Sequence, residues 1–318
     1  MVTVAPQKLV SARGFPSMSV EGRFAQTHPV KGRAEVFVEV LCGHIHVTAS
    51  DLEEIQVRAL ARARAGIVAP GELEGRLRSL QQNPPIEQRG SIIKIGRVLG
   101  MERERHLFIN YDLIVPFFSR IVCRASSGSI TVEGPAESLD ASTSCGAITV
   151  RGARGDVVAL ATDGEVEVQS VRGRVTISTA SGSIFARDVA GPLHAATGSG
   201  LISMEHVTSD DLVATAGSGQ IDLRDVSGKI RATSFSGAIA VEGKGGKGRW
   251  TLTSSCGDLT VGLPPATGVE LHARTLAGTI KALRPLNSIA ANQAHLSGAG
   301  DGTLRLELTT LRGDIHIR

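Results

Sequence analysis

Three residues near the start of the chain are of types that bind transition metals. Cys42, His44 and His46 alternate in the stretch "CGHIHV", a spacing that places side chains on one face of a strand. Thiolate and imidazole groups together bind zinc and related ions, but no fourth ligand is identifiable from the sequence. The alternative is that Cys42 replaces a repeat serine and that both histidines are exposed polar residues. We expect no metal and no other cofactor.

The tripeptide Arg-Gly-Asp, which can act as an adhesion signal, occurs twice, at Arg154-Gly155-Asp156 and at Arg312-Gly313-Asp314. Both glycines belong to a regular repeat, and each aspartate is the first outward residue of the strand that follows. Integrin-type recognition needs an exposed flexible loop, whereas these residues lead into strands. We therefore interpret both tripeptides as by-products of the repeat.

Serines and carboxylates recur along the chain, but not in combinations that suggest catalysis. Glu167 and Asp222 share an outward position three repeats apart, roughly 14 Å at the spacing of stacked strands, which is too far for a glycosidase pair. No histidine or aspartate recurs beside the repeat serines to activate a nucleophile. A calcium-binding roll needs a recurring aspartate before its repeat glycines. Among the repeat glycines that follow a short polar residue, listed below, only Gly164 follows an aspartate, Asp163. We predict that the protein is not an enzyme, with a carbohydrate-active enzyme as the less favoured alternative.

The feature that must position all these residues is a repeat of nine. Most neighbouring glycines in the middle of the chain are 9 or 18 residues apart, and the residues two and four places after each of them are apolar. A spacing of two between apolar residues is strand alternation, and glycine suits the turn before each strand because it accepts positive φ. The glycines are Gly128, Gly146, Gly155, Gly164, Gly173, Gly182, Gly191, Gly200, Gly219, Gly228, Gly237, Gly248 and Gly257.

Alternate nonapeptides differ, so the true repeat is 18 residues. In one half the glycine follows a short polar residue, and these residues form the turn ladder: Ser127, Cys145, Asp163, Ser181, Ser199, Ser218, Ser236 and Cys256. In the other half the strand continues to a third inward position that stays small, at Thr143, Ala161, Thr179, Thr197, Ala216, Ser234 and Ser254. We interpret the turn ladder as structural, because short polar side chains can satisfy the backbone groups of a turn.

One 18-residue unit cannot bury both of its strands alone, so the units are expected to stack. We predict an all-β, single-chain β-solenoid with 18-residue coils of two short strands, and one short helix in the N-terminal region. Residues 1–33 would be an irregular segment, 34–124 a β-rich cap with the helix near 70–82, 125–283 the regular solenoid, and 284–318 a capping loop with closing strands. The final strand, with Ile315 and Ile317, would leave an edge for the segment "LNSIAANQAHLSGAGDG" to cover.

Composition excludes several classes of function. The 34 basic and 31 acidic residues are interspersed, and with one Trp and one Tyr there is no stacking platform for bases, so we expect no nucleic-acid partner. No stretch has the length and apolar character of a signal peptide or a membrane-spanning helix. Four cysteines without Cys-x-x-Cys spacing fit a reducing compartment. These features favour a cytoplasmic location.

The chain resembles the bacterial DUF4097 β-strand-repeat family, whose members are also described as "putative adhesins". The resemblance runs from about residue 35 to the end. It is carried by "EVLCGHIHVTASDLEEIQVRA", by "INYDLIVPFFSRIVCRASSGSITVEG", by repeats such as "STASGSIFARDVAGPLHAATGSGLISM", and by the closing "LRLELTTLRGDIHIR". The resemblance implies a repeat architecture without established catalytic residues, and some members are associated with the bacterial envelope.

Together, the residues and the resemblance favour a non-enzymatic β-solenoid scaffold or binding protein that is adhesin-like or envelope-associated. Its partner would be a protein or a component of the cell envelope, bound through repeated outward side chains. The alternative is a cytoplasmic scaffold that assembles with further copies of itself through its terminal coils, as bactofilins do. The sequence leaves the ligand and the cellular location open.

Overall fold

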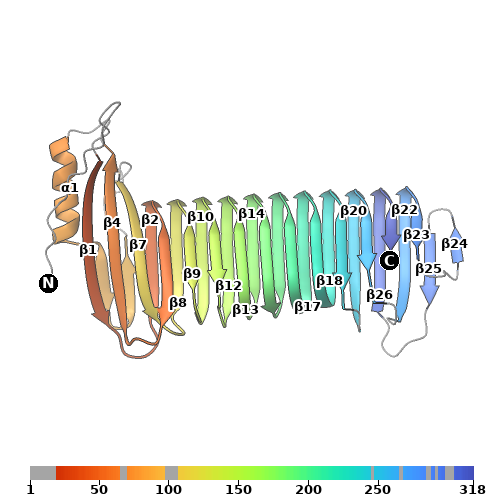
Figure 1. The fold of residues 1–318 in the computed structure, drawn as a ribbon, viewed down its shortest axis with the longest axis horizontal. Helices are drawn as coiled ribbons and strands as arrows, with labels where there is room; N and C mark the ends of the chain where they lie inside the picture. Colours follow the sequence, from red (N-terminus) through yellow and green to blue (C-terminus); the bar gives the residue numbers. More distant parts are fainter. Residues whose placement is uncertain are drawn as a thin grey trace. The chain divides into compact units, whose positions relative to one another are not determined.

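The computed structural model describes residues 19–64, 70–96, 107–244, 247–264, 268–283, 288–290, 293–297 and 304–318. These residues are nearly all in β-strands, with one helix among them, which confirms the predicted fold class. The chain divides into two compact units, Met1–Thr149 and Val150–Arg318. Figure 1 shows the strands of each unit lying side by side. The finer domain boundaries given above stay predictions, except that residues 19–29 of the segment expected to be irregular form a strand.

The first unit has one helix and ten complete strands in its described part. In chain order these are β1 (Ser19–Pro29), β2 (Glu35–Cys42), β3 (Ile45–Ser50), β4 (Glu54–Arg64), α1 (Pro70–Gln82), β5 (Ile86–Arg89), β6 (Ile92–Ile95), β7 (Leu107–Pro116), β8 (Arg120–Ser127), β9 (Ile130–Glu133) and β10 (Ser138–Cys145). β11 (Ile148–Arg151) contains the division between the units.

The helix α1 begins and ends where proline chemistry predicts. Pro70 fits the first helical turn, where no backbone N–H is required, and Pro84 restricts the residue before it to extended backbone just beyond the last turn. Leu77 is buried, and Gly22 of β1 leaves room for it. The Nε2 of Gln81 donates to the carbonyl of Arg23, 3.2 Å away. The helix therefore lies against β1, as Figure 1 shows.

The sequence predicts an irregular segment over residues 1–33, but residues 19–29 form β1. This strand pairs antiparallel with β4 along its whole length. Phe24 is buried, and its ring meets that of Tyr111 edge-on at 6.4 Å between centroids. The prediction failed because backbone pairing and α1 hold β1, so the strand needs no alternating apolar pattern of its own. Residues 1–18 lie outside the described residues.

The coils of the first unit do not stack in chain order. β2 lies between β6 and β8, and β3 lies between β7 and β9, all in parallel register. The coil made by β2 and β3 is therefore enclosed by two coils that come later in the chain. β4 then pairs antiparallel with both β7 and β1, so that strands of opposite direction close this end of the stack.

The second unit continues the same architecture with sixteen complete strands in its described part. They are β12 (Asp156–Asp163), β13 (Val166–Arg172), β14 (Val175–Ser181), β15 (Ile184–Ala190), β16 (Leu193–Ser199), β17 (Ile202–Ser218), β18 (Ile221–Ser236), β19 (Ile239–Gly243), β20 (Gly248–Cys256), β21 (Leu259–Gly262), β22 (Val269–Ala277), β23 (Ile280–Ala282), β24 (Ser288–Ala290), β25 (Gln293–Ser297), β26 (Leu304–Arg312) and β27 (Ile315–Ile317).

Parallel pairing places equivalent residues of successive coils on top of one another. Val157 pairs with Val175, Val175 with Leu193, and Leu193 with Leu212, and all four are buried. The coil that contains β17 has one extra residue, which causes a register shift between Ser209 and Leu212. Aliphatic residues fill the interior because each inward position meets the same position of the next coil. The predicted stacking of strands one coil apart is confirmed.

The turns that join successive strands of the coils, which we call corners, depend on glycine. Gly200 has φ of +143°, and a Cβ there would lie 2.2 Å from the carbonyl oxygen of Gly182 in the neighbouring coil. The equivalent distance is 2.1 Å between Gly182 and Gly164, and 1.9 Å between Gly219 and Gly200. Any side chain at these positions would collide with backbone. The repeat glycine is thus required by the close approach of coils as well as by its own φ.

A column of buried hydroxyl groups fastens each of these corners. The side chain at the third inward position donates to the carbonyl of a corner glycine in the neighbouring coil; for Thr197 and Gly182 the distance is 2.9 Å. The same bond occurs at 3.0 to 3.2 Å for Thr143, Thr179, Ser234, Ser254, Thr275 and Thr310. The small hydroxyl residues seen in the sequence therefore have a specific role.

The C-terminal coil is also enclosed rather than terminal. β26 lies between β20 and β22, and β27 lies between β21 and β23, in parallel register on both sides. The sequence predicts a capping segment over the last strand, but Ile315 and Ile317 are covered by an earlier coil. Beyond it, β25 pairs antiparallel with β22 and β24 with β25. Residues 284–287, 291–292 and 298–303 of the expected cap lie outside the described residues.

Replacing a corner glycine by alanine should unfold the stack locally. We expect Gly200→Ala to lower the free energy of unfolding by about 3 kcal/mol or more, because the Cβ meets backbone at a positive φ. Gly75→Ala is the matched control, since no atom lies within 4 Å of its Cβ position on α1, and it should gain up to about 1 kcal/mol. Urea unfolding measures both. Equal stability of the two variants would contradict this account of the corner.

Removing one buried hydroxyl should also cost stability, but less. Thr197→Val keeps the shape of the side chain and deletes its donor to Gly182, so we expect a loss of about 1 kcal/mol. Thr215→Val removes an exposed hydroxyl one coil away and should be neutral. Thermal unfolding of the two variants makes the comparison, and an unchanged midpoint for Thr197→Val would rule out the fastening role.

Candidate functional site

The outward side of β13, β15 and β17 carries a surface hollow of about 430 Å³. Phe185 is the aromatic residue in its lining, and it stands between Glu167 and Ser203 in the parallel register. We call this feature the Phe185 hollow; its outward lining residues are Glu165, Glu167, Gln169, Phe185, Arg187, Ser203 and Glu205. Its volume is within the range of small-ligand sites, about 300 to 1,000 Å³.

The charges around the hollow are largely paired. The guanidinium of Arg187 donates to Oε2 of Glu205 through Nε, at 3.0 Å, and through Nη2. This hydrogen bond raises the pKa of Arg187 and lowers the pKa of Glu205. Arg151 approaches Glu167 at 3.6 Å between Nη2 and Oε2. Each of the two carboxylates therefore lies beside a cation.

Three polar side chains of the hollow remain available to a ligand. Within the described part of the chain, the side chains of Glu165, Gln169 and Ser203 make no hydrogen bond or ion pair. They offer a carboxylate, an amide and a hydroxyl next to the half-buried ring of Phe185. The hollow thus places one aromatic ring among several hydrogen-bonding groups, and it is more polar than most small-molecule pockets.

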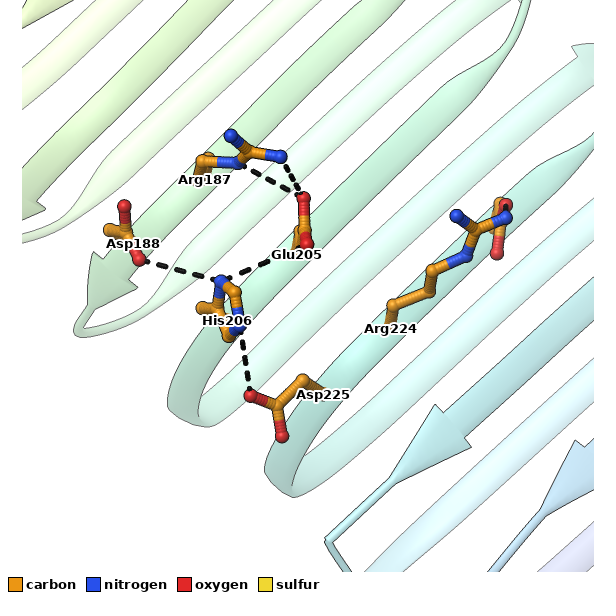
Figure 2. A network of polar contacts seen from close by, with 7 residues as sticks. Arg187, Asp188, Glu205, His206, Arg224 and Asp225 are labelled. Carbon is orange, nitrogen blue, oxygen red and sulfur yellow. Dashed lines mark hydrogen bonds and ion pairs between the residues drawn. The ribbon is translucent and has the colours of Figure 1, made fainter.

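A column of unusual backbone geometry borders the same face. Ser170, Asp188, His206 and Asp225 have φ between 53° and 55°, although none is glycine. Figure 2 shows His206 between Asp188 and Asp225, with Glu205 beside it. Its Nδ1 lies 3.6 Å from Asp188 Oδ1 and its Nε2 lies 3.3 Å from Asp225 Oδ2. Asp and His tolerate this left-handed region better than most residues, which explains their presence at the corner.

The predicted metal candidates do not converge. His44 Nδ1 is 2.7 Å from the hydroxyl of Ser129, and Cys42 ends β2 beside the turn ladder. His46 lies instead between Asp112 and Glu133, at 3.4 and 3.8 Å. Among the residues that the structure describes, no group of three or more His, Cys, Asp or Glu is arranged to hold a metal ion.

Cys123, the buried cysteine, is not a reactive thiol. Cys123 is fully buried on β8, and burial raises its pKa to about 12, with a smaller contribution from the charge of Asp140. The thiol is therefore protonated at physiological pH, whereas nucleophilic cysteines are exposed and have lowered pKa values.

The two carboxylates considered for catalysis stay apart. Glu167 pairs with Phe185, Phe185 with Ser203, and Ser203 with Asp222, so three coils separate the acids. Asp222 accepts a hydrogen bond from Arg224 at 2.7 Å instead. This arrangement gives no support to a glycosidase mechanism.

The aspartates of both Arg-Gly-Asp tripeptides hold neighbouring coils together. Asp156 Oδ1 accepts the backbone N–H of Arg174 at 3.1 Å, and Asp314 Oδ1 accepts that of Thr279 at 2.7 Å. The N–H of Asp314 in turn donates to Asp258 at 2.8 Å. The hydrogen bond from Thr279 lowers the pKa of Asp314. These carboxylates therefore serve the stacking of coils.

The turn ladder lies on the surface in continuous columns within each unit. Ser181 pairs with Ser199, Ser199 with Ser218, and Ser218 with Ser236, and all are exposed. In the described part of the chain, however, no ladder side chain makes a hydrogen bond. The buried hydroxyl column, two residues earlier in the strand, donates the hydrogen bonds to the turn. The role that we expected of the ladder side chains is therefore filled by these buried hydroxyl groups.

Sequence reasoning missed the Phe185 hollow and the left-handed column. A signal for the column exists, since Ser170, Asp188, His206 and Asp225 recur at the repeat distance and are types that accept positive φ. The hollow has no such signal, because it is formed by side chains of different coils.

Acid should weaken the C-terminal coil through Asp314. The pKa of this group is lower in the folded state, so its contribution is present above the ordinary aspartate value of about 3.9 and is lost as pH falls through the folded value. Asp314→Ala should lower the free energy of unfolding at neutral pH. The free energy of unfolding of this variant should also fall less than that of the wild type as the pH is lowered. Urea unfolding across this pH range measures both quantities. Asp163→Ala, at an exposed side chain without a hydrogen bond, is the control, and an unchanged acid dependence in Asp314→Ala would contradict the assignment.

Comparison with known proteins places these features in context. A search of curated proteins found no match. No helix in the described ranges has the length and apolar character needed to cross a membrane.

Three solved structures are similar over most of their length. The "putative cell adhesion protein" of Clostridium sporogenes is 10% identical, with 93% of this chain and 98% of that chain covered, at a TM-score of 0.18. The "putative adhesin" of Bacteroides fragilis is 11% identical, with 93% and 97% covered, at 0.34. The "putative lipid binding protein" of Parabacteroides distasonis is 9% identical, with 93% and 97% covered, at 0.33.

The family comparison agrees with the repeat and the stacked coils described above. The model of the Toastrack DUF4097 family matches residues 156–318, which is just over half of the chain and nearly all of the second unit. The chain belongs to the Toastrack DUF4097 family.

Proposed function

We propose that this protein is a non-enzymatic β-solenoid that binds a component of the cell envelope in an adhesin-like manner. The observation that carries the proposal is the Phe185 hollow, where an aromatic ring adjoins unpaired polar side chains on an otherwise ion-paired strand face. Membership of the Toastrack DUF4097 family fits this proposal, because the resemblance noted in the sequence implies adhesin-like members.

The proposal rests on a division between the inside and the outside of each coil. The inside is uniform, because aliphatic residues stack on their equivalents from coil to coil. The outside is variable: the position occupied by Glu167 is taken by Phe185, Ser203 and Asp222 in the following coils. A constant backbone that presents different outward side chains is suited to selective binding, and rigid elements hold such side chains accurately.

The alternative of end-to-end assembly has less support. It requires unpaired strands at the terminal coils, but antiparallel strands cover them in both units. In the first unit β1 pairs with β4 and α1 lies against β1, and in the second β25 pairs with β22. The short edge strand β23 carries the charged Lys281, a common protection against strand pairing.

Binding to isolated envelope fragments tests the proposal. We expect the purified protein to cosediment saturably with envelope fragments of its native host, and the double variant Phe185→Ala/Gln169→Ala to bind at least about tenfold more weakly. The control is Thr176→Ala/Ser178→Ala, at outward positions of β14 away from the hollow. Absence of saturable binding, or equal binding by both variants, would disprove the role of the hollow.

A further inference from the structure

One corner of the last coils exposes large apolar side chains where earlier coils have small residues. Phe235, Leu276 and Leu311 are 70%, 72% and 50% exposed, and they stand two residues before Gly237, Gly278 and Gly313. We call them the apolar corner. The same position in earlier coils of the second unit holds Thr162, Ala180, Gly198 and Gly217. Scattered exposed apolar residues are ordinary, but a column of them is not.

Stacking places these three side chains in one column. Ser236 pairs with Cys256, Cys256 with Arg312, and Arg312 with Ala277. The residues that precede these four in the chain therefore stack in the order Phe235, Ser255, Leu311 and Leu276. Leu311 and Leu276 are therefore in adjacent coils, and Phe235 is two coils from Leu311 with Ser255 between. At about 4.8 Å per coil the column is roughly 14 Å long.

Charge is segregated along the second unit, and the apolar corner lies in its basic part. Residues 228–318 contain eleven Lys and Arg against six Asp and Glu, a net charge of +5. Residues 150–227 contain six against ten, a net charge of −4. The formal charge of +3 for the whole chain conceals this difference. Three exposed cations, Arg274, Lys281 and Arg312, flank the corner residues along their own strands and turns.

Two acidic residues of the same turns accept hydrogen bonds from the backbone. Asp258 and Asp314 follow repeat glycines on the other side of the turn, and each accepts a backbone N–H through Oδ1. These hydrogen bonds offset part of their negative charge. Lys281 lies close enough to Asp314 for their charges to attract, whereas Arg274 and Arg312 form no ion pair among the described residues.

The backbone N–H groups of these turns already have hydrogen-bond partners within the protein. The N–H of Gly237 donates to the carbonyl of Cys256 at 2.9 Å, that of Gly257 to Arg312 at 2.9 Å, and that of Gly313 to Ala277 at 3.1 Å. Bringing a turn towards lipid is costly when its N–H groups lose water without a partner. Here those groups bond to the next coil, so little is lost.

We propose that the apolar corner docks this protein on an anionic lipid bilayer. Phe235, Leu276 and Leu311 enter the interface between headgroups and acyl chains, while Arg274, Lys281 and Arg312 contact anionic headgroups. Apolar insertion and electrostatic attraction together give interfacial binding that depends on lipid charge. A single column of exposed side chains suits a fluid interface better than it suits a protein surface, which would need a matching groove. This site is separate from the Phe185 hollow and does not depend on its function.

Vesicle sedimentation tests the proposal with the full chain. We expect binding to vesicles of phosphatidylcholine with phosphatidylglycerol, and at least about tenfold weaker binding to phosphatidylcholine alone. The variant Phe235→Ser/Leu276→Ser/Leu311→Ser should lose at least about tenfold in binding to the anionic vesicles. The control Leu160→Ser, at an outward leucine of β12 that is 41% exposed in the acidic part, should bind normally.

A second measurement does not depend on the stability of the triple variant. Phe235→Trp adds an exposed indole to a chain whose single tryptophan, Trp250, is buried. Its emission should shift to the blue on addition of anionic vesicles and not on addition of neutral ones.

Three results would overturn the proposal: no binding to anionic vesicles, equal binding to both kinds of vesicle, or no shift in Phe235→Trp. Analytical ultracentrifugation adds a fourth. A wild-type dimer that the triple variant abolishes would identify a second copy of the chain, rather than lipid, as the occupant of the apolar corner.

Discussion

Most features of this structure depend on one constraint, which is the close approach of each corner glycine to the carbonyl of the glycine in the neighbouring coil. Gly200 can lie on Gly182 only because it has no Cβ, and Thr197 can reach the Gly182 carbonyl only because the coils are that close. The same contact brings the aliphatic residues of adjacent coils into register. One spatial constraint therefore accounts for the glycine period, the buried hydroxyls and the uniform core.

Because this constraint acts on the inside and at the corners, it leaves the outward residues free to vary. The ion pair of Arg187 with Glu205, the column around His206 and the Phe185 hollow all lie on outward positions of the same coils. The Arg-Gly-Asp tripeptides show the opposite case, since Asp156 and Asp314 are held by backbone N–H groups of neighbouring coils. Sites of recognition are therefore to be sought where side chains depart from the repeat, and the apolar corner is such a departure.

The repeat allows the strands, their inward residues and their pairing one coil apart to be predicted, because each follows from alternation and burial. The order of coils could not be predicted in this way. The inward residues of β27, Ile315 and Ile317, are chemically equivalent to those of neighbouring coils, so nothing in their types shows that β27 lies between β21 and β23. Likewise, Ser199 and Thr197 are both suited to a turn, and only burial assigns the hydrogen bond to Thr197. The hollow depends on Phe185 and its neighbours across coils, which a linear pattern does not display.

The central claim is that close contact between corners holds the coils in a stack whose order differs from their order in the chain. The C-terminal coil tests this claim most directly, because β26 and β27 come last in the chain but lie between earlier strands. Native-state hydrogen exchange can compare the peptide covering residues 304–318 with the one covering residues 248–262. If β26 and β27 are paired on both sides, their amides should be protected as strongly as those of β20 and β21, although they are the last in the chain. Rapid exchange of residues 304–318, at the rate of a fraying terminus, would contradict the account.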